Sequence, residues 1–263
     1  MVIFRKSVVL WIALAVQPLL AQGPGARDLQ SPNAQALPPQ AEQLFALANQ
    51  TRAAQRLRTL KWDPALATAA LQHCVRMAAE GPISHRYGGE LDLSARAGQA
   101  GAHFSLIEEN VAVGPSPANV HEGWMNSPGH RANLLSPDID RVGIAVVRKG
   151  EVIYAVADYA RAVLVLTPAQ VEANLAEMLR ARGLTILKDP SQARAYCGSS
   201  GRLKGLDAPG FLMRWQNSDI TQLPAGLLER VASGQYRQAA VGSCPAQDVE
   251  GAFTVYRVAV LLY

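Results

Sequence analysis

Residues 122–137, EGWMNSPGHRANLLSP, decide how this chain is interpreted. Ser127 and Pro128 are typical of a helix start, because serine accepts a hydrogen bond from a free backbone N–H and proline has no N–H to leave unpaired. His130 then falls at the third helical position. The partial positive charge at a helix start disfavours a protonated imidazole. We therefore expect His130 to be neutral and able to coordinate a metal or accept a proton.

Two other segments carry polar residues that can act together with His130. His85 lies in PISHR, directly after the Gly-Pro pair that ends a predicted helix, and Glu109 precedes Asn110 in IEENVAVG. Two neutral imidazoles and one carboxylate suit a divalent metal such as zinc. However, the two histidines are far from the spacing of a metal-binding pair on one helix. A hydrogen-bonded polar cluster that fixes a loop against the helices remains the alternative.

The order of patterns along the chain predicts helices packed on a sheet. A helix is expected over residues 39–60, and a second begins at Asp63-Pro64, where the aspartate can cap the free N–H groups. Residues 84–115 show no sustained period and are predicted to be an irregular loop. Further helices begin at the Ser-Pro pairs. VGIAVV and VIYAVADYA, separated by RKGE, predict an antiparallel hairpin.

The last third of the chain, residues 165–263, is predicted to form a small separate α+β unit. Thr167-Pro168 opens an amphipathic helix, and three strand-like segments follow: LTILK, QAAVGSC and FTVYRVAVLLY. Cys197 and Cys244 both lie in this part, and sequence alone leaves open whether they pair. WMNS at 124–127 resembles WQNS at 215–218, with chance favoured over a degenerate duplication.

The N-terminus has the pattern of a secretory signal peptide. A basic start and a short apolar run precede small residues, which predicts cleavage after Ala21 and a flexible leader over residues 22–38. An uncleaved anchor is the alternative, although the run is short for a membrane span. The formal net charge of +4 falls by two when Arg5 and Lys6 are removed. We expect a secreted or periplasmic protein with no membrane span after cleavage, and no nucleic-acid partner, because no strong basic patch is present.

Several ordered motifs resemble a bacterial member of the CAP superfamily, which comprises cysteine-rich secretory, antigen-5 and pathogenesis-related proteins. They are LFALANQTRAAQRLRTLKWDPAL, HCVRMAAEG, SHR, EENVAVG, W-x-x-SPGHRANLL and VGIAVV…VIYAVADYA. The resemblance implies an α/β fold over residues 39–162, a three-layer α-β-α sandwich with a central antiparallel sheet. It also implies a cleft lined by two histidines and two acids. His85, Glu109 and His130 match three of these, and Ser127 stands where the second acid belongs.

Three functions follow from this resemblance and the residues that carry it. The first is an exported binding module whose His85/Glu109/His130 cleft holds a divalent metal through His85 and His130, or a small, lipid or peptide-like ligand. The second is a metal- or Glu109-assisted, peptidase-like hydrolase that uses the same residues. A serine nucleophile is weakly supported, because no G-x-S-x-G stretch occurs and Ser127 is interpreted as a helix cap. The third is a structural protein that interacts with a cell-envelope component and has no ligand.

Overall fold

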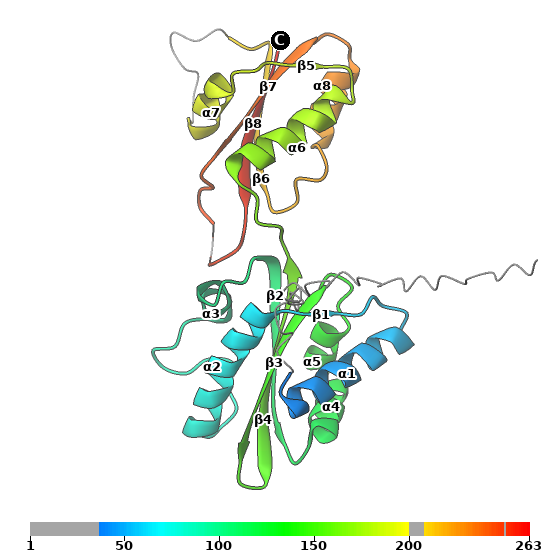
Figure 1. The fold of residues 1–263 in the computed structure, drawn as a ribbon, viewed down its shortest axis with the longest axis vertical. Helices are drawn as coiled ribbons and strands as arrows, with labels where there is room; N and C mark the ends of the chain where they lie inside the picture. The colour runs from blue at the N-terminus through cyan, green and yellow to red at the C-terminus, as the bar shows by residue number, and fades with distance from the viewer. Residues whose placement is uncertain (1–36, 200–207, 250) are drawn as a thin grey trace, which may run out of the picture. The chain divides into compact units, whose positions relative to one another are not determined.

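The computed structural model describes residues 37–199, 208–249 and 251–263 (Figure 1). The predicted signal peptide, and the predicted leader up to residue 36, lie outside the described residues. Within the described ranges, no helix has both the length and the apolar character needed to cross a membrane.

The first sheet is built from four strands in the order β1-β3-β4-β2. Strand β1 pairs parallel to β3, and the other neighbours are antiparallel. The strands are β1 (Lys61–Trp62), β2 (Phe104–Gly114), β3 (Arg141–Lys149) and β4 (Val152–Ala162). The helices that accompany them are α1 (Pro39–Ala54), α2 (Pro64–Glu80), α3 (Leu93–Gln99), α4 (Pro117–Asn126) and α5 (Pro128–Leu134).

Helices cover both faces of this sheet (Figure 1). Side chains alternate between the two faces of a strand. Ile153, Ala155, Ala157 and Tyr159 of β4 therefore pack in the core formed with α1, α4 and α5. Val156 and Ala160, which point the other way, pack under α2 and α3. The structure confirms the expected three-layer sandwich, with a mixed rather than purely antiparallel sheet.

The local patterns predicted some elements correctly and others wrongly. The hairpin of β3 and β4 is confirmed, and Gly150 adopts the positive φ of 60° that its turn requires. The first helix ends at Ala54, not near residue 60, and the supposed irregular loop over 84–115 contains α3 and all of β2. Strand β2 was missed because its polar residues hide the alternation, and pairing with β4 stabilises it. Ser127 occupies the N-cap position of α5, but its side chain makes no capping hydrogen bond.

The second sheet also has four strands, in the order β5-β7-β8-β6. The predicted helix and the three predicted strands are present, whereas α7, β6 and α8 were not predicted. The amphipathic helix begins with a capping box in which Thr167 and Gln170 bond reciprocally. The elements are α6 (Pro168–Arg180), β5 (Thr185–Ile186), α7 (Ser191–Gly198), β6 (Phe211–Asn217), α8 (Ala225–Ala232), β7 (Gln238–Cys244) and β8 (Tyr256–Leu262).

The two sheets share one topology. Each has a short strand after its first helix, and that strand pairs parallel to the first strand of a C-terminal hairpin. Each also has a glycine where the helix after the short strand meets the sheet. A Cβ added at Gly143 would lie 1.9 Å from the backbone nitrogen of Ala67, and one added at Gly242 would lie 2.2 Å from that of Arg194. The WMNS and WQNS tetrapeptides lie on α4 and β6, which are not equivalent elements.

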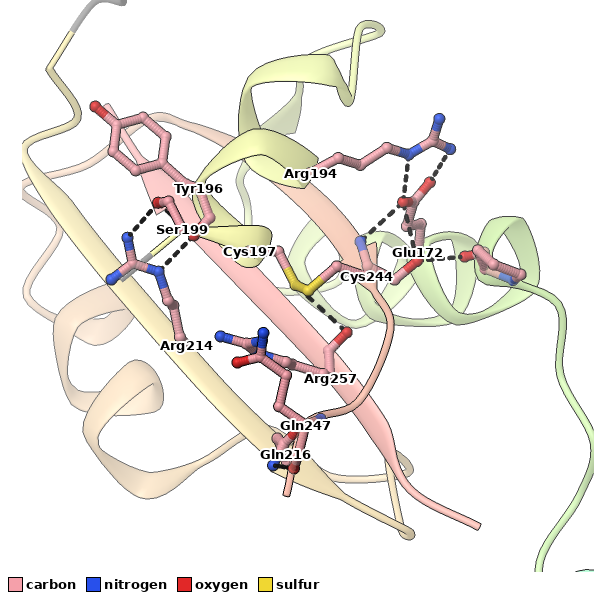
Figure 2. The surroundings of a disulfide bond; sticks show 12 residues. Glu172, Arg194, Tyr196, Cys197, Ser199, Arg214, Gln216, Cys244, Gln247 and Arg257 are labelled. Atoms are coloured by element: carbon pink, nitrogen blue, oxygen red, sulfur yellow. Dashed lines mark hydrogen bonds and ion pairs between the residues drawn. A yellow bond between two sulfur atoms is a disulfide. The ribbon is translucent and has the colours of Figure 1, made fainter. Parts of the chain in front are cut away.

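Cys197 and Cys244 form a disulfide that joins the end of α7 to the end of β7 (Figure 2). Glu172 of α6 adds a second link, because its carboxylate accepts two hydrogen bonds from the guanidinium of Arg194 on α7, at 2.7 and 2.6 Å. The backbone N–H of Ser243 also donates to Glu172. The disulfide thus ties α7 to β7, and Glu172 ties α6 to both α7 and β7.

Candidate functional site

The centre of the candidate site is a hydrogen-bonded pair of His85 and Glu109. Nδ1 of His85 lies 2.8 Å from Oε1 of Glu109. Strand β2 places the carboxylate on the face of the sheet toward α2, where Glu109 is only 6% exposed. The His85 side chain is 59% exposed. The hydrogen bond to Glu109 raises the pKa of His85, against smaller opposing effects of burial and of the Arg96 charge.

Arg96 of α3 belongs to the same group and was missed in the sequence. One of its terminal nitrogens, Nη2, makes a short contact with Oε2 of Glu109. Its other terminal nitrogen, Nη1, donates to the backbone carbonyls of His85 and Leu91, each at 3.3 Å. Arg96 is 3% exposed, so this guanidinium lies inside the protein. Both oxygens of Glu109 therefore already have a partner.

A second buried acid, Asp158, lies beside this pair. It is the cross-strand partner of Glu109 in the β2–β4 ladder, so both side chains lie on the same face of the sheet. Asp158 is fully buried, and neither of its carboxyl oxygens has a hydrogen-bond partner within the described ranges. Burial raises the pKa of Asp158 well above its ordinary value, and the charge of Glu109 raises it further. Both effects favour the neutral form of Asp158.

The segment that carries His85 is held against α2 by His73. Nδ1 of His73 lies 2.7 Å from Oε1 of Glu90, and Nε2 lies 2.8 Å from the backbone carbonyl of Ser84. His73 is fully buried. This burial follows from its position on the inner face of α2, next to the buried Cys74.

His130 completes the group from the opposite side. Its ring centroid lies 6.3 Å from that of His85, with the two planes tilted by 50°. Asn110 fixes its position, because Nδ2 of Asn110 donates to the backbone carbonyl of His130 at 2.9 Å, and Asn133 in turn donates to Asn110. Burial lowers the pKa of His130, as does the nearby charge of His85. The expected neutral imidazole thus has burial as its main cause.

The residues present fit a metal ion poorly. His85 and His130 can each offer a ring nitrogen, but both oxygens of Glu109 are engaged by His85 and Arg96. A catalytic zinc site has three protein ligands and an open position. Across the described part of the chain, no group of three or more His, Cys, Asp or Glu residues is placed to hold a metal.

Sequence reasoning found the two histidines and Glu109, and it missed the residues that surround them. Asp158 carried a usable signal, because it is a single charged residue inside the apolar run VIYAVADYA. Arg96 carried none, since LSARAGQ lies in a stretch with no clear period. Glu90 likewise became recognisable only when the fold brought it to His73.

Comparison with known proteins gives the family of the first sheet and its helices. Residues 45–159 match the model of the cysteine-rich secretory protein family, CAP. The uncharacterized protein YkwD of Bacillus subtilis is 30% identical over 115 residues, which cover 42% of this chain and 44% of that protein. The chain spans less than half the length of the first curated relatives that it matches.

Two solved structures are similar to about half of the chain. An extracellular protein containing an SCP domain, from Bacillus anthracis, is 29% identical with a TM-score of 0.44, covering 47% of this chain and 40% of that one. A structure of NaASP2 with Zn2+ is 10% identical with a TM-score of 0.36, covering 49% and 83%. The motifs, the fold and the family match agree: the chain carries a CAP domain of the cysteine-rich secretory protein family over residues 45–159.

Proposed function

We propose that this CAP domain is an exported binding module whose cleft, formed around His85, Glu109 and His130, holds a small peptide-like ligand. The observation that carries this proposal is the His85–Glu109 hydrogen bond beneath an exposed imidazole. Because Nδ1 of His85 is engaged by Glu109, the ring is fixed in orientation and its Nε2 faces a ligand as the remaining polar atom. His130 supplies a second imidazole, whose ring centroid lies 6.3 Å from that of His85.

Export is part of the same proposal. The signal-peptide pattern supports a secreted or periplasmic location, and the Cys197–Cys244 disulfide supports an oxidising compartment. We also propose that residues 39–162 and 165–263 are separate domains. Each sheet has its own hydrophobic core, the second one formed by residues of α6, α8, β7 and β8.

A hydrolase is the second candidate, and one observation favours it. Glu109 holds the Nδ1–H of His85, which is how a carboxylate orients a histidine that acts as a general base through Nε2. The neighbouring hydroxyl of Ser84 is engaged, because it donates to the carbonyl of Arg86. A hydrolase at this site would therefore activate a water molecule, and Glu109→Gln would abolish turnover while leaving peptide binding measurable.

The proposed binding function is tested by nuclear magnetic resonance on the purified protein. Short N-acetylated peptides, a fatty acid and zinc chloride are added separately while the ring signals of His85 and His130 are followed. We expect a peptide to shift both histidines, and the His85→Ala/His130→Ala double variant to lose binding. The matched control is His103→Ala, which removes an exposed histidine outside the cleft.

Each alternative gives a different result in that experiment. If zinc alone shifts both rings with micromolar affinity, the cleft is a metal site and the peptide proposal is wrong. If no probe shifts either ring and the double variant only lowers the melting temperature, the cleft residues serve the fold. The protein is then the structural, envelope-interacting member of the three possibilities.

A further inference from the structure

We propose that Arg96 is a positioning residue, one that sets the geometry of the His85–Glu109 pair. This inference rests on the proposed binding site and names the residue that organises it. His85 and Glu109 are 24 positions apart and come from different elements, a connecting segment and strand β2. Arg96 is the one described side chain that contacts both the acid and the backbone of the histidine.

The contacts of Arg96 explain how one side chain can do this. Nη2 holds the carboxylate of Glu109, and Nη1 holds the carbonyls of His85 and Leu91. A guanidinium is planar and rigid, so its two ends cannot move independently. Arg96 thereby holds Glu109 and the segment that carries His85 at the distance at which Glu109 contacts Nδ1 of His85.

Burial and charge make the arrangement specific for arginine. Arg96 and Glu109 are both almost fully buried, and a second carboxylate, that of Glu90, lies 4.0 Å from Nη1. A buried cation between two carboxylates is compensated on both sides, whereas a neutral residue would leave both buried acids without the charge that compensates them. Asp92 caps α3, the helix that carries Arg96, by accepting a 2.9 Å hydrogen bond from the backbone N–H of Ala95. This cap stabilises the helix turn from which the Arg96 side chain extends.

A simpler possibility is that Arg96 acts on His85 only through its charge. The two roles predict opposite changes in the pKa of His85 when Arg96 is removed. The positive charge of Arg96 lowers the pKa of His85, while the hydrogen bond to Glu109 raises it more strongly. If Arg96 acted only through its charge, its removal would raise the pKa of His85. If Arg96 positions the pair, its removal loses the Glu109 hydrogen bond, and the pKa of His85 falls toward that of an exposed histidine.

The experiment follows the Cε1–H signal of His85 from about pH 5 to about pH 8, where histidines titrate. It compares the purified wild type with Arg96→Gln and Arg96→Lys, in the absence of any ligand. We expect the midpoint of His85 to fall in both variants. Lysine keeps the charge but has no rigid fork to hold the carboxylate and the carbonyls together. A charge-only role would instead be rescued by lysine.

The matched control is Arg86→Gln, which removes an exposed arginine next to His85 without touching Glu109. We expect it to leave the midpoint in place or raise it. If Arg96→Gln does not fold, the midpoint of His85 in Arg96→Lys and the exchange rate of the Arg96 guanidinium protons in the wild type test the positioning role. The guanidinium protons of Arg96 should exchange slowly with solvent in the wild type. A raised midpoint in Arg96→Gln, an unchanged one in Arg96→Lys, or fast exchange in the wild type would overturn the proposal.

These outcomes are separate from those that test the proposed function. The titration uses no ligand, so a cleft that binds no peptide can still show Arg96 in the positioning role. Conversely, peptide binding that survives in Arg96→Gln would leave the proposed function standing and remove only the role of Arg96.

Discussion

Replacing Asp158 with asparagine should stabilise the protein by an amount that grows as the pH rises. The side chain is fully buried opposite Glu109, and burial raises its pKa well above the ordinary value, followed by the charge of Glu109. The folded protein therefore binds a proton that the unfolded chain releases above about pH 4. Since the native state binds more protons, the free energy of unfolding falls as the pH rises between the unfolded and folded pKa values of Asp158.

The slope of this effect follows from linkage. Within that window the wild type loses about 1.4 kcal/mol of stability per pH unit from this group, or about 3 kcal/mol over two units. The Asp158→Asn variant has no ionisable group at this position and lacks the slope. Urea unfolding from about pH 5 to about pH 8 measures both proteins over the range in which most proteins are maximally stable.

Asp138→Asn is the matched control, because Asp138 is an exposed aspartate whose side chain is 61% accessible. We expect this variant to keep the wild-type pH slope. The opposite outcome is an asparagine variant that is less stable than the wild type by the same amount at every pH. That result would mean that Asp158 is ionised in the native state and paired with a cation.

Three further predictions follow from other parts of the structure. Gly143→Ala should lower the free energy of unfolding, measured with urea, by more than about 3 kcal/mol, because the added Cβ would lie 1.9 Å from helix backbone. The control is Gly123→Ala on α4, which has nothing within 4 Å of the added Cβ and should be neutral or stabilising by about 0.5–1 kcal/mol. Serine at both Cys197 and Cys244 should lower stability by about 2–5 kcal/mol, and a reducing agent should produce the same loss in the wild type but none in the variant. Titration calorimetry with a peptide that binds should give one binding site per chain, because Arg214 of the second sheet occupies the position that Glu109 occupies in the first. A stoichiometry of two peptides per chain would contradict this expectation.

The position of Arg214 follows from the ladders of the two sheets. Glu109 and Gly143 both pair with Asp158, and in the second sheet Arg214 and Gly242 both pair with Ala259. The row that holds the two acids in the first sheet therefore holds an arginine and an alanine in the second. The two sheets share a topology, but the second one lacks the acid that orients a histidine.

The sequence alone was enough for the elements whose signals are local. The hairpin of β3 and β4 has apolar strands and a Lys-Gly turn, and the α5 start has its Ser-Pro-Gly-His pattern. Strand β2 lacked such a signal, because its Glu109 and Asn110 are polar and bond to groups from other elements. The shared topology was hidden for a similar reason, since the tetrapeptides that looked alike lie on a helix and on a strand.

The candidate site was predictable as a set of residue types, but its geometry was not. His85, Glu109 and His130 were found because their motifs resemble a known family. Arg96 and Asp158 act through contacts between distant segments, and a single sequence shows neither the contacts nor the burial. These two residues change the chemistry, because they engage and surround the one carboxylate that the sequence offered as a metal ligand.

In the proposed site, Glu109 fixes the ring of His85 so that Nε2 faces a ligand beside His130. Long-range nitrogen–proton spectra of the histidine rings, recorded above the midpoint of His85, show which ring nitrogen carries the proton. We expect neutral His85 to carry its proton on Nδ1, with Nε2 unprotonated, and we expect this signature to disappear in Glu109→Ala. A neutral His85 with its proton on Nε2, unchanged by Glu109→Ala, would mean that Glu109 does not orient the ring.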